Sequence, residues 1–184
     1  MSDSFPLRPP ILETDRLTLR ALSVDDAATI YDYASDPEVA RYTLWPPHPS
    51  EAFTRNFLAK LTESTVLAWV IVFRADQRVV GMIFFHSFNQ WHQRAELAFN
   101  LARSHWRRGV ATEASHTALQ FAFEKLTLNR VEATCMPGNS ASRRVLIKLG
   151  MEHEGTLRRS HRRHDGFHDM ELFGVTHRSN HTSL

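Results

Sequence analysis

The stretch HWRRGVATE, residues 105–113, joins an apolar strand-like run to an amphipathic helix-like run. The first N–H groups of a helix lack backbone partners and lie at the positive end of the helix dipole, so an anion is stabilised there. Gly109 and Ala111 leave room for phosphate oxygens near the backbone, and Arg107 and Arg108 add attracting charge. The stretch therefore predicts either a phosphate-binding turn or a plain solvated loop, and its surroundings must distinguish the two.

Apolar residues alternate, or recur at helical spacing, on both sides of this turn. The expected strands cover 16–22, 67–73, 79–85, 94–102, 131–136, 151–163 and 167–175. The expected helices cover 27–34, 51–61, 112–126 and 141–149. Because strands and helices are interspersed along one chain, the sequence predicts an α/β (α+β) domain built on one central sheet.

Capping and turn residues mark the ends of these elements. Residues 23–26 and Ser50 are typical N-caps of the first two helices, and Gly150 is a typical C-cap. Asp36-Pro37 predicts a turn, and residues 164–166 (HDG) predict a hairpin between the last two strands.

Length and composition favour one globular domain. The chain has 184 residues, of which 42% are hydrophobic, enough for one ordinary core. We expect a single domain over 1–184 with a core at about 12–176 and a polar tail at 177–184. No apolar run has the length of a signal peptide or a membrane span, so a cytoplasmic protein without membrane contact is expected.

The single cysteine, Cys135, excludes an internal disulfide. It lies in an apolar run, where a buried inert thiol is favoured over a nucleophile.

Charge is distributed unevenly along the chain. Residues 1–100 carry 9 Lys and Arg against 12 Asp and Glu, whereas residues 101–184 carry 13 against 8. Arginine accounts for 19 of the 22 basic residues, and its planar guanidinium suits bidentate contact with phosphate or carboxylate. The basic half therefore predicts a polyanionic ligand, either a nucleotide-like cofactor or a nucleic acid.

A second strand-to-helix junction follows the first. The turn PGNS at 137–140 places Asn139 and Ser142 at the start of another helix, and Arg143, Arg144 and Lys148 follow. Two neighbouring strand ends that each lead into a helix form a crevice suited to an extended anion.

Together these segments resemble the GNAT superfamily of acetyl-CoA-dependent N-acetyltransferases, and most closely its ribosomal-protein N-terminal acetyltransferase (RimJ/RimL-like) branch. The resemblance is carried, in chain order, by ETDRLTLRAL at 13–22, DPEVARY at 36–42, WPP at 45–47, RAELAFNLARSHWRRGVATEA at 94–114, GNSASRRVLIKLGM at 138–151, HEGTLR at 153–158 and DGFHDMELFGV at 165–175. It implies the GNAT fold, a mixed and mostly antiparallel sheet of about six to seven strands flanked by about four helices.

The resemblance also implies acetyl-CoA as cosubstrate, with no metal. Backbone groups of 108–112 would hold the pyrophosphate, strand 98–101 would pair with the pantetheine arm, and Asn139 and Ser142 would lie near the arm and its sulfur. The implied cofactor-binding residues are Ala98, Phe99, Asn100, Leu101, Trp106, Arg107, Arg108, Gly109, Val110, Ala111, Thr112, Asn139, Ser142 and Arg143. Two departures stand out: Trp106 replaces the glutamine that often begins the phosphate loop, and Leu146 replaces a tyrosine that often protonates the thiolate.

Acetyl transfer requires a neutral amine, so a group that accepts a proton must be present. Glu96, on the strand before the phosphate loop, is the first candidate, although a surface glutamate paired with Arg94 is an open alternative. His161 is the second candidate because imidazole titrates near neutral pH. Ser142 is the candidate donor to the departing thiolate, and a backbone N–H near 99–100 would stabilise the charge on the acetyl oxygen.

The acceptor pocket is expected around the first two helices and the loop between them. Its candidate residues are Glu38, Tyr42, Trp45 and Asp169, of which the acids would attract a cationic amine. The acceptor itself stays open: a protein N-terminus, a polyamine, an amino acid and an antibiotic all carry a suitable amine. The oligomeric state is also open, with a homodimer as one option.

Two other functions compete with this one. The segment RRSHRRH, residues 158–164, has four arginines that would follow a nucleic-acid or ribosomal phosphate backbone. Strand alternation would split them, with Arg158 and Arg162 on one face and Arg159 and Arg163 on the other. A sensor that binds acetyl-CoA without turnover is the second alternative. His161, His164 and His168 are spaced too irregularly to predict a metal site.

Overall fold

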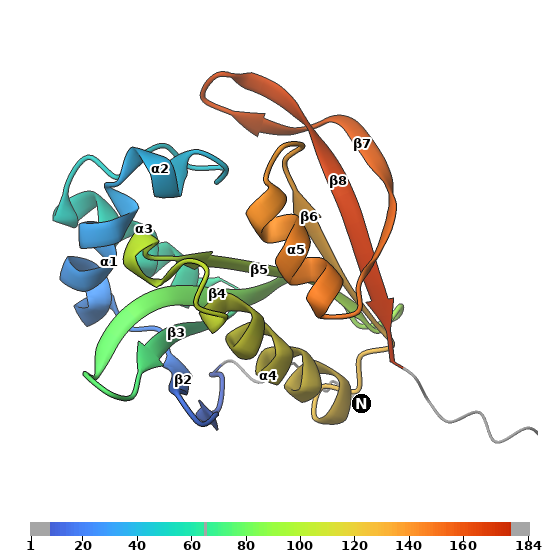
Figure 1. The fold of residues 1–184 in the computed structure, drawn as a ribbon, viewed down its shortest axis with the longest axis horizontal. Coiled ribbons are helices and arrows are strands. Elements are labelled where there is room, and N and C mark those ends of the chain that lie inside the picture. The colour runs from blue at the N-terminus through green and yellow to red at the C-terminus, as the bar shows by residue number, and fades with distance from the viewer. Residues whose placement is uncertain (1–7, 65, 178–184) are drawn as a thin grey trace, which may run out of the picture.

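The structure is a computed structural model that describes residues 8–64 and 66–177. Within these residues eight strands form one sheet in the order β1-β2-β3-β4-β5-β6-β8-β7 (Figure 1). The predicted tail lies outside the described residues from 178 onward. The mixed α/β fold expected from the sequence is confirmed, with eight strands where six to seven were expected.

The strands are β1 (Leu12–Glu13), β2 (Leu17–Ala21), β3 (Leu67–Phe73), β4 (Arg78–Asn89), β5 (Arg94–Leu101), β6 (Arg130–Cys135), β7 (Glu152–Arg163) and β8 (Gly166–Thr176). The α-helices are α1 (Ala27–Ala34), α2 (Pro37–Ala40), α3 (Glu51–Glu63), α4 (Val110–Glu124) and α5 (Ser140–Lys148). Short 3₁₀ turns precede α1 at Val24–Asp26 and α4 at Arg103–His105. The sequence predicted the longer elements closely but missed the two-residue β1 and the single turn of α2.

Local chemistry explains where the helices begin and end. The Ser50 hydroxyl accepts a hydrogen bond from the Phe53 N–H at 3.2 Å and caps α3. Asp36 caps α2, and Pro37 fits the first helical position because a proline lacks the N–H that would be unpaired there. Gly150 follows α5 at φ 79°, the left-handed conformation that ends many helices.

Strand pairing is antiparallel throughout the sheet except between β5 and β6. These two strands run parallel, and their register covers only residues 94–96 opposite 130–132. Beyond Glu96, β5 continues along β4, while β6 continues along β8. The two central strands therefore diverge, and the sheet opens between them.

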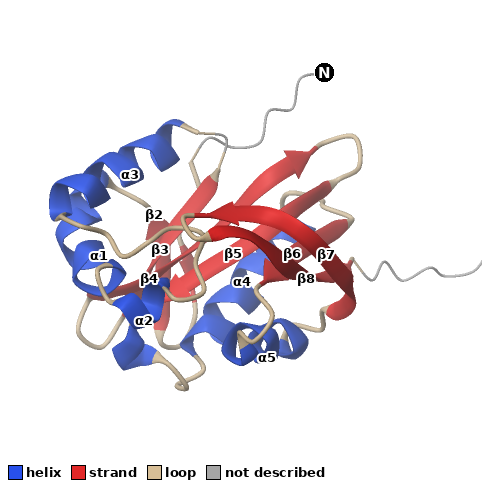
Figure 2. Cartoon of the chain, turned by 90° about the horizontal axis from the view of Figure 1, so that it is seen from above, coloured by secondary structure: helices blue, strands red, loops and turns tan. Residues whose placement is uncertain are grey.

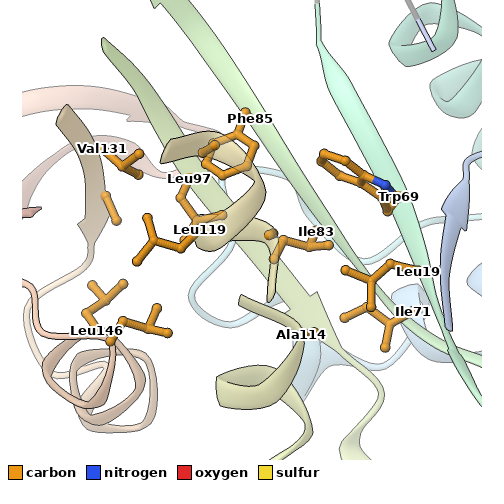
Figure 3. Packing of buried hydrophobic residues seen from close by; sticks show 14 of the residues in the cluster. Leu19, Trp69, Ile71, Ile83, Phe85, Leu97, Ala114, Leu119, Val131 and Leu146 are labelled. Atoms are coloured by element: carbon orange, nitrogen blue, oxygen red, sulfur yellow. The ribbon is translucent and has the colours of Figure 1, made fainter. Parts of the chain in front are cut away.

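The sheet has an apolar core on each face because side chains alternate along every strand. One core packs α4 and α5 against residues such as Trp69, Ile83 and Leu97 (Figure 3). The other packs α1 and α3 against Val70 and Met82. Figure 2 shows the strands between these two groups of helices. Both faces are thereby covered at β2, β3 and β4, while the second group of helices does not extend to β6, β7 and β8.

Candidate active site

A cavity of ≈ 570 Å³ lies where β5 and β6 diverge. Its walls come from seven parts of the chain: α2 with the loop that follows it, β4, β5, the start of α4 with the turn before it, the segment from β6 into α5, β7 and β8. Most predicted site residues line it, namely Glu38, Tyr42, Trp45, Glu96, Ala98, Phe99, Asn100, Leu101, Trp106, Arg107, Gly109, Val110, Ala111, Thr112, Asn139, Ser142 and His161. Arg108, Arg143 and Asp169 are not among the lining residues.

The start of α4 forms one wall of the cavity. Gly109 is the N-cap at φ 78°, and Arg107 before it also has a positive φ of 60°. This turn places the first residues of α4, 110–112, along the cavity. Since N–H groups at a helix start have no partner within the helix, they can donate to an anion in the cavity.

The carboxylate of Glu113, in the first turn of α4, is paired with side chains that lie outside the cavity lining. Its carboxylate accepts hydrogen bonds from the Thr14 hydroxyl at 2.6 Å and from Arg16 Nε at 2.8 Å. Burial alone would raise the pKa of Glu113, but the bonds from Thr14 and Arg16 outweigh it and hold that pKa below its usual range. The negative charge closest to the helix start is thus paired and does not repel an anion.

Basic side chains also line the cavity. They are only in part the arginines and the lysine that the sequence indicated for the phosphate site. Arg107, Arg144 and Lys148 are lining residues. The Arg108 guanidinium lies over the Phe73 ring, 5.6 Å from its centroid, so only the backbone of Arg108 belongs to the turn. Arg143 is directed elsewhere, because its Nη1 donates to Glu171 at 3.0 Å.

The free edge of β5 forms the floor of the cavity. Since the register with β6 ends at Glu96, backbone groups of 97–101 on that side have no strand partner within the described residues. The Trp106 indole N–H donates a hydrogen bond to one of these backbone groups, the Leu101 carbonyl, at 2.8 Å. The Asn100 side chain is fixed from the opposite direction, because its Oδ1 accepts a hydrogen bond from the buried Tyr33 hydroxyl at 3.0 Å. The remaining edge is available to an extended ligand.

The start of α5 faces this edge. Asn139 is the N-cap, and its Oδ1 accepts a hydrogen bond from the Ser142 N–H at 3.1 Å. The Ser142 hydroxyl lines the cavity and has no hydrogen-bond partner among the described residues. Leu146, one turn later, is buried in the core. Ser142 is therefore a hydroxyl of this helix that is free to donate a proton into the cavity.

Glu96 lies at the point of divergence and lines the cavity. Its Oε1 accepts a hydrogen bond from the Thr134 hydroxyl at 2.8 Å, and its Oε2 lies 4.0 Å from His86 Nδ1. Arg94 does not bind Glu96, because its guanidinium pairs with Glu132 at 2.8 Å. The carboxylate is thus held in place without an arginine or lysine partner.

Thr134 and His86 were not singled out by the sequence. Strand alternation places His86 on the same face as Phe84, but nothing local indicates that this histidine lies opposite Glu96. The contact depends on the register of two strands and becomes visible only in the folded sheet.

The acceptor residues divide into two groups. Glu38, Tyr42 and Trp45, on α2 and the following loop, line the cavity, and His161 lines it from β7. Asp169 is outside the lining, and its Oδ1 accepts a hydrogen bond from the Arg159 N–H at 2.7 Å. Aromatic rings and a carboxylate therefore flank the end of the cavity opposite the cationic end.

The arginine-rich segment 158–164 does not form a regular strand face. The register between β7 and β8 shifts between Leu157 and His161, and Arg159 has a φ of 48°. The strict alternation expected for these arginines is therefore wrong at this point. Arg163 is buried, with its side chain only 8% exposed, and this removes one of the four arginines from any basic surface for nucleic acid.

Arg163 instead bridges the β7–β8 hairpin to the loop after α2. Its Nη1 donates to the Arg41 carbonyl at 3.0 Å and also contacts the Met136 sulfur at 3.0 Å. Arg41 directly precedes the residues that form the aromatic wall of the cavity. The bridge joins segments 122 positions apart in sequence.

We expect Arg163→Gln to raise the KM for the acceptor by about tenfold, because losing this bond releases the loop that carries Tyr42 and Trp45. The affinity for acetyl-CoA should change little, since Arg163 lies outside the cavity lining. Steady-state kinetics with each substrate varied in turn would check this, with Arg162→Gln as the matched control. An equal loss of affinity for both substrates would contradict the assignment of the bridge to the acceptor side.

Cys135 lines the cavity, yet its thiol is poorly suited to nucleophilic attack. Burial, together with the nearby Glu171 carboxylate, raises its pKa to about 11, so little thiolate exists near neutral pH. We expect alkylation by iodoacetamide at pH 8 to be more than about tenfold slower than that of free cysteine, even after the higher intrinsic nucleophilicity of a high-pKa thiolate is included. Mass spectrometry of timed samples would measure this, and alkylation as fast as free cysteine would contradict it.

Two features are absent from the described residues. Within residues 8–64 and 66–177, no three His, Cys, Asp or Glu side chains gather as a set of metal ligands. In the same residues, no helix has the length and apolar character needed to cross a membrane.

Comparisons with known proteins agree with this geometry. The model of the acetyltransferase (GNAT) domain family matches residues 16–152. The uncharacterized N-acetyltransferase YoaA of Bacillus subtilis is 36% identical over 153 residues, which cover 81% of this chain and 86% of YoaA. A GNAT-family acetyltransferase structure from Bacillus anthracis has a TM-score of 0.82 at 26% identity and covers 91% of this chain and 98% of that one.

A fourth similarity concerns the fold alone. The structure of Mycobacterium smegmatis RimJ in complex with CoA-disulfide has a TM-score of 0.84 at 23% identity, covering 93% of this chain and 89% of RimJ. The family match extends from β2 to the start of β7 and so includes both helix starts that border the cavity.

Proposed function

Because the chain belongs to the acetyltransferase (GNAT) family and is an acetyl-CoA-dependent N-acetyltransferase, we propose a specific reaction for its cavity. The acetyl group of acetyl-CoA is transferred directly to a primary amine, with Glu96 accepting the proton that the amine loses. The observation that carries this proposal is the divergence of β5 and β6 next to the start of α4, with Glu96 at the last paired position. We treat the chain as one such domain with its core at about 12–176.

The residues at the cationic end of the cavity suit the donor. N–H groups of 109–112 would bind the pyrophosphate, and Arg107, Arg144 and Lys148 would supply counter-charge. The open edge of β5 at 98–101 would pair with the amide groups of the pantetheine arm, as an added strand does. Acetyl-CoA would supply the reactive thioester, and these residues would orient it in the cavity.

Direct transfer is favoured over an acetylated enzyme. A covalent route requires an activated nucleophile in the cavity, and the raised pKa of Cys135 leaves its thiol protonated. Ser142 has no hydrogen bond to a histidine or carboxylate among the described residues, so its hydroxyl is not activated for attack. It is instead positioned to donate a proton to the departing thiolate.

The remaining steps of the reaction are assigned to β5. Glu96 accepts the proton because its carboxylate lines the cavity and is oriented by Thr134 without a strong cationic partner. A backbone N–H near 99–100 stabilises the charge that develops on the acetyl oxygen. His161 is the alternative base, and its hydrogen bond with Ser160 at 3.0 Å leaves its other ring nitrogen available.

The acceptor is a primary amine that reaches the end formed by α2 and β7. Glu38 and Glu96 attract an ammonium group there, and Tyr42, Trp45 and Phe84 provide aromatic faces for it. We assign the chain to the RimJ/RimL-like branch on its sequence pattern, which includes Trp106 before the two arginines. On that basis an N-terminal amine is the first acceptor to test.

The test is a calorimetric titration with acetyl-CoA, with CoA and ATP as comparison ligands, followed by an amine panel. Saturable micromolar binding of acetyl-CoA is expected. The panel contains a Ser-Ala-Ala-Tyr tetrapeptide with a free N-terminus, spermidine, free amino acids and kanamycin, and thiol release reports turnover. Failure to bind acetyl-CoA would overturn the proposal, and turnover of spermidine or kanamycin alone would exclude the N-terminal acceptor.

A further inference from the structure

We propose that His86 is a positioning and proton-relay residue that takes the amine proton from Glu96 and passes it to solvent. This inference rests on the proposed role of Glu96 as the base. His86 lies on β4, directly opposite Glu96 in the antiparallel register of β4 and β5, so the two side chains share one face of the sheet. Both line the cavity.

The two oxygens of Glu96 have different neighbours. Oε1 is occupied by the Thr134 hydroxyl at 2.8 Å, whereas Oε2 faces His86 Nδ1 at 4.0 Å. The same ring nitrogen lies 2.8 Å from the hydroxyl of Ser87, which is exposed. Nδ1 of the imidazole is therefore close both to a carboxylate in the cavity and to a hydroxyl in contact with solvent.

Few other charged groups act on His86. Within the described residues Glu96 is its one ion-pair partner. The neighbouring strand β3 contributes no titratable side chain, and Arg94 of β5 is bound to Glu132 of β6. Glu38 of α2 and Arg41 after it pair with each other at 3.7 Å. His161 lines the cavity from β7. Glu96 is thus the acidic side chain that faces His86.

The relay accounts for both protons that the acceptor loses. An ammonium acceptor must lose two protons to become an amide, and the departing thiolate takes up one of them. The other is the net proton released per turnover. It moves from the ammonium nitrogen to Glu96 Oε2, freeing the nitrogen lone pair for attack on the acetyl carbon as the C–S bond breaks. The Ser87 hydroxyl turns away from His86 Nδ1, which then accepts the proton across a distance that one water or a small side-chain rotation closes, and solvent removes it from the ring.

The test compares His86→Gln with His92→Gln, a control on an exposed histidine in the turn between the same two strands. Rates are measured with acetyl-CoA and the fastest amine of the panel at low buffer concentration. We expect His86→Gln to lower kcat by about tenfold with the KM for acetyl-CoA unchanged. Added imidazole should restore the rate, because a dissolved base can remove the proton that the missing side chain carried. The dependence of kcat on pH is also measured for the wild type and for both variants.

A purely structural role for His86 would give a loss that imidazole does not restore, and that result would overturn the relay. A wild-type rate and pH profile in His86→Gln would overturn it as well. These outcomes differ from failure of the proposed function: if Glu96→Gln keeps the full rate, the base assignment fails, and if the wild type does not bind acetyl-CoA, the donor site fails.

Discussion

Gly109→Asp is expected to lower the affinity for acetyl-CoA by about 100-fold or more. Two causes act together at this position. Gly109 has a φ of 78°, which costs a residue with a Cβ about 1 kcal/mol. The new carboxylate would also stand at the helix start proposed to bind the pyrophosphate, where like charges about 4 Å apart repel by about 4 kcal/mol near a protein surface. Calorimetric titration with acetyl-CoA measures the loss.

Gly150→Asp is the matched control for this variant. Gly150 has nearly the same φ, 79°, and no atom lies within 4 Å of where its Cβ would stand. It is not among the cavity-lining residues. Both variants add one carboxylate and similar backbone strain, and only Gly109→Asp should lose binding. Equal affinities in the two variants would mean that the turn at Gly109 does not hold the pyrophosphate.

The turn and the helix after it were predictable because their chemistry is local. A glycine before a helix, flanked by arginines, determines the conformation and the charge within a few residues of sequence. The same holds for the Ser50 cap and for the strand at 67–73, whose predicted bounds agree with β3. In each case the residues that specify the structure are neighbours in the chain.

The catalytic environment was less predictable because it depends on strand register. Glu96 was identified as a candidate, with a surface glutamate paired with Arg94 as the alternative, and in the structure Arg94 pairs instead with Glu132, 38 positions away. Thr134, which holds Glu96, is equally distant in sequence. One residue of slip between β5 and β6 would turn the side chains of one strand to the opposite face of the sheet and break both contacts, and no local pattern determines that register.

The register shift in β7 could not be predicted from the sequence for a related reason. Alternation is the default for a strand, and RRSHRRH contains no glycine or proline that would signal a bulge. The register shift and the burial of Arg163 follow from contacts with β8 and with the loop after α2. The whole charged segment was therefore expected to lie on the surface, although the side chain of Arg163 is buried and donates to the loop after α2.

Glu96→Gln should lower kcat by about 100-fold or more near neutral pH, the usual contribution of a positioned base. The amide has nearly the same shape and can still accept the hydrogen bond from Thr134, so the strand and the cavity should be unchanged. Affinity for acetyl-CoA should stay within about twofold, since the donor contacts lie at the helix start and along 98–101. The measurement is kcat and the calorimetric Kd of the same preparation.

Glu152→Gln is the control for a change of charge on a strand, because Glu152 is exposed at the start of β7 and lies outside the cavity lining. It should retain wild-type activity. A base that must be ionised also predicts that raising the pH restores part of the activity of Glu96→Gln, because the fraction of acceptor amine that is already neutral then increases tenfold per pH unit below its pKa. Full activity of Glu96→Gln at every pH would transfer the role of base to His161, the other titratable candidate in the cavity wall.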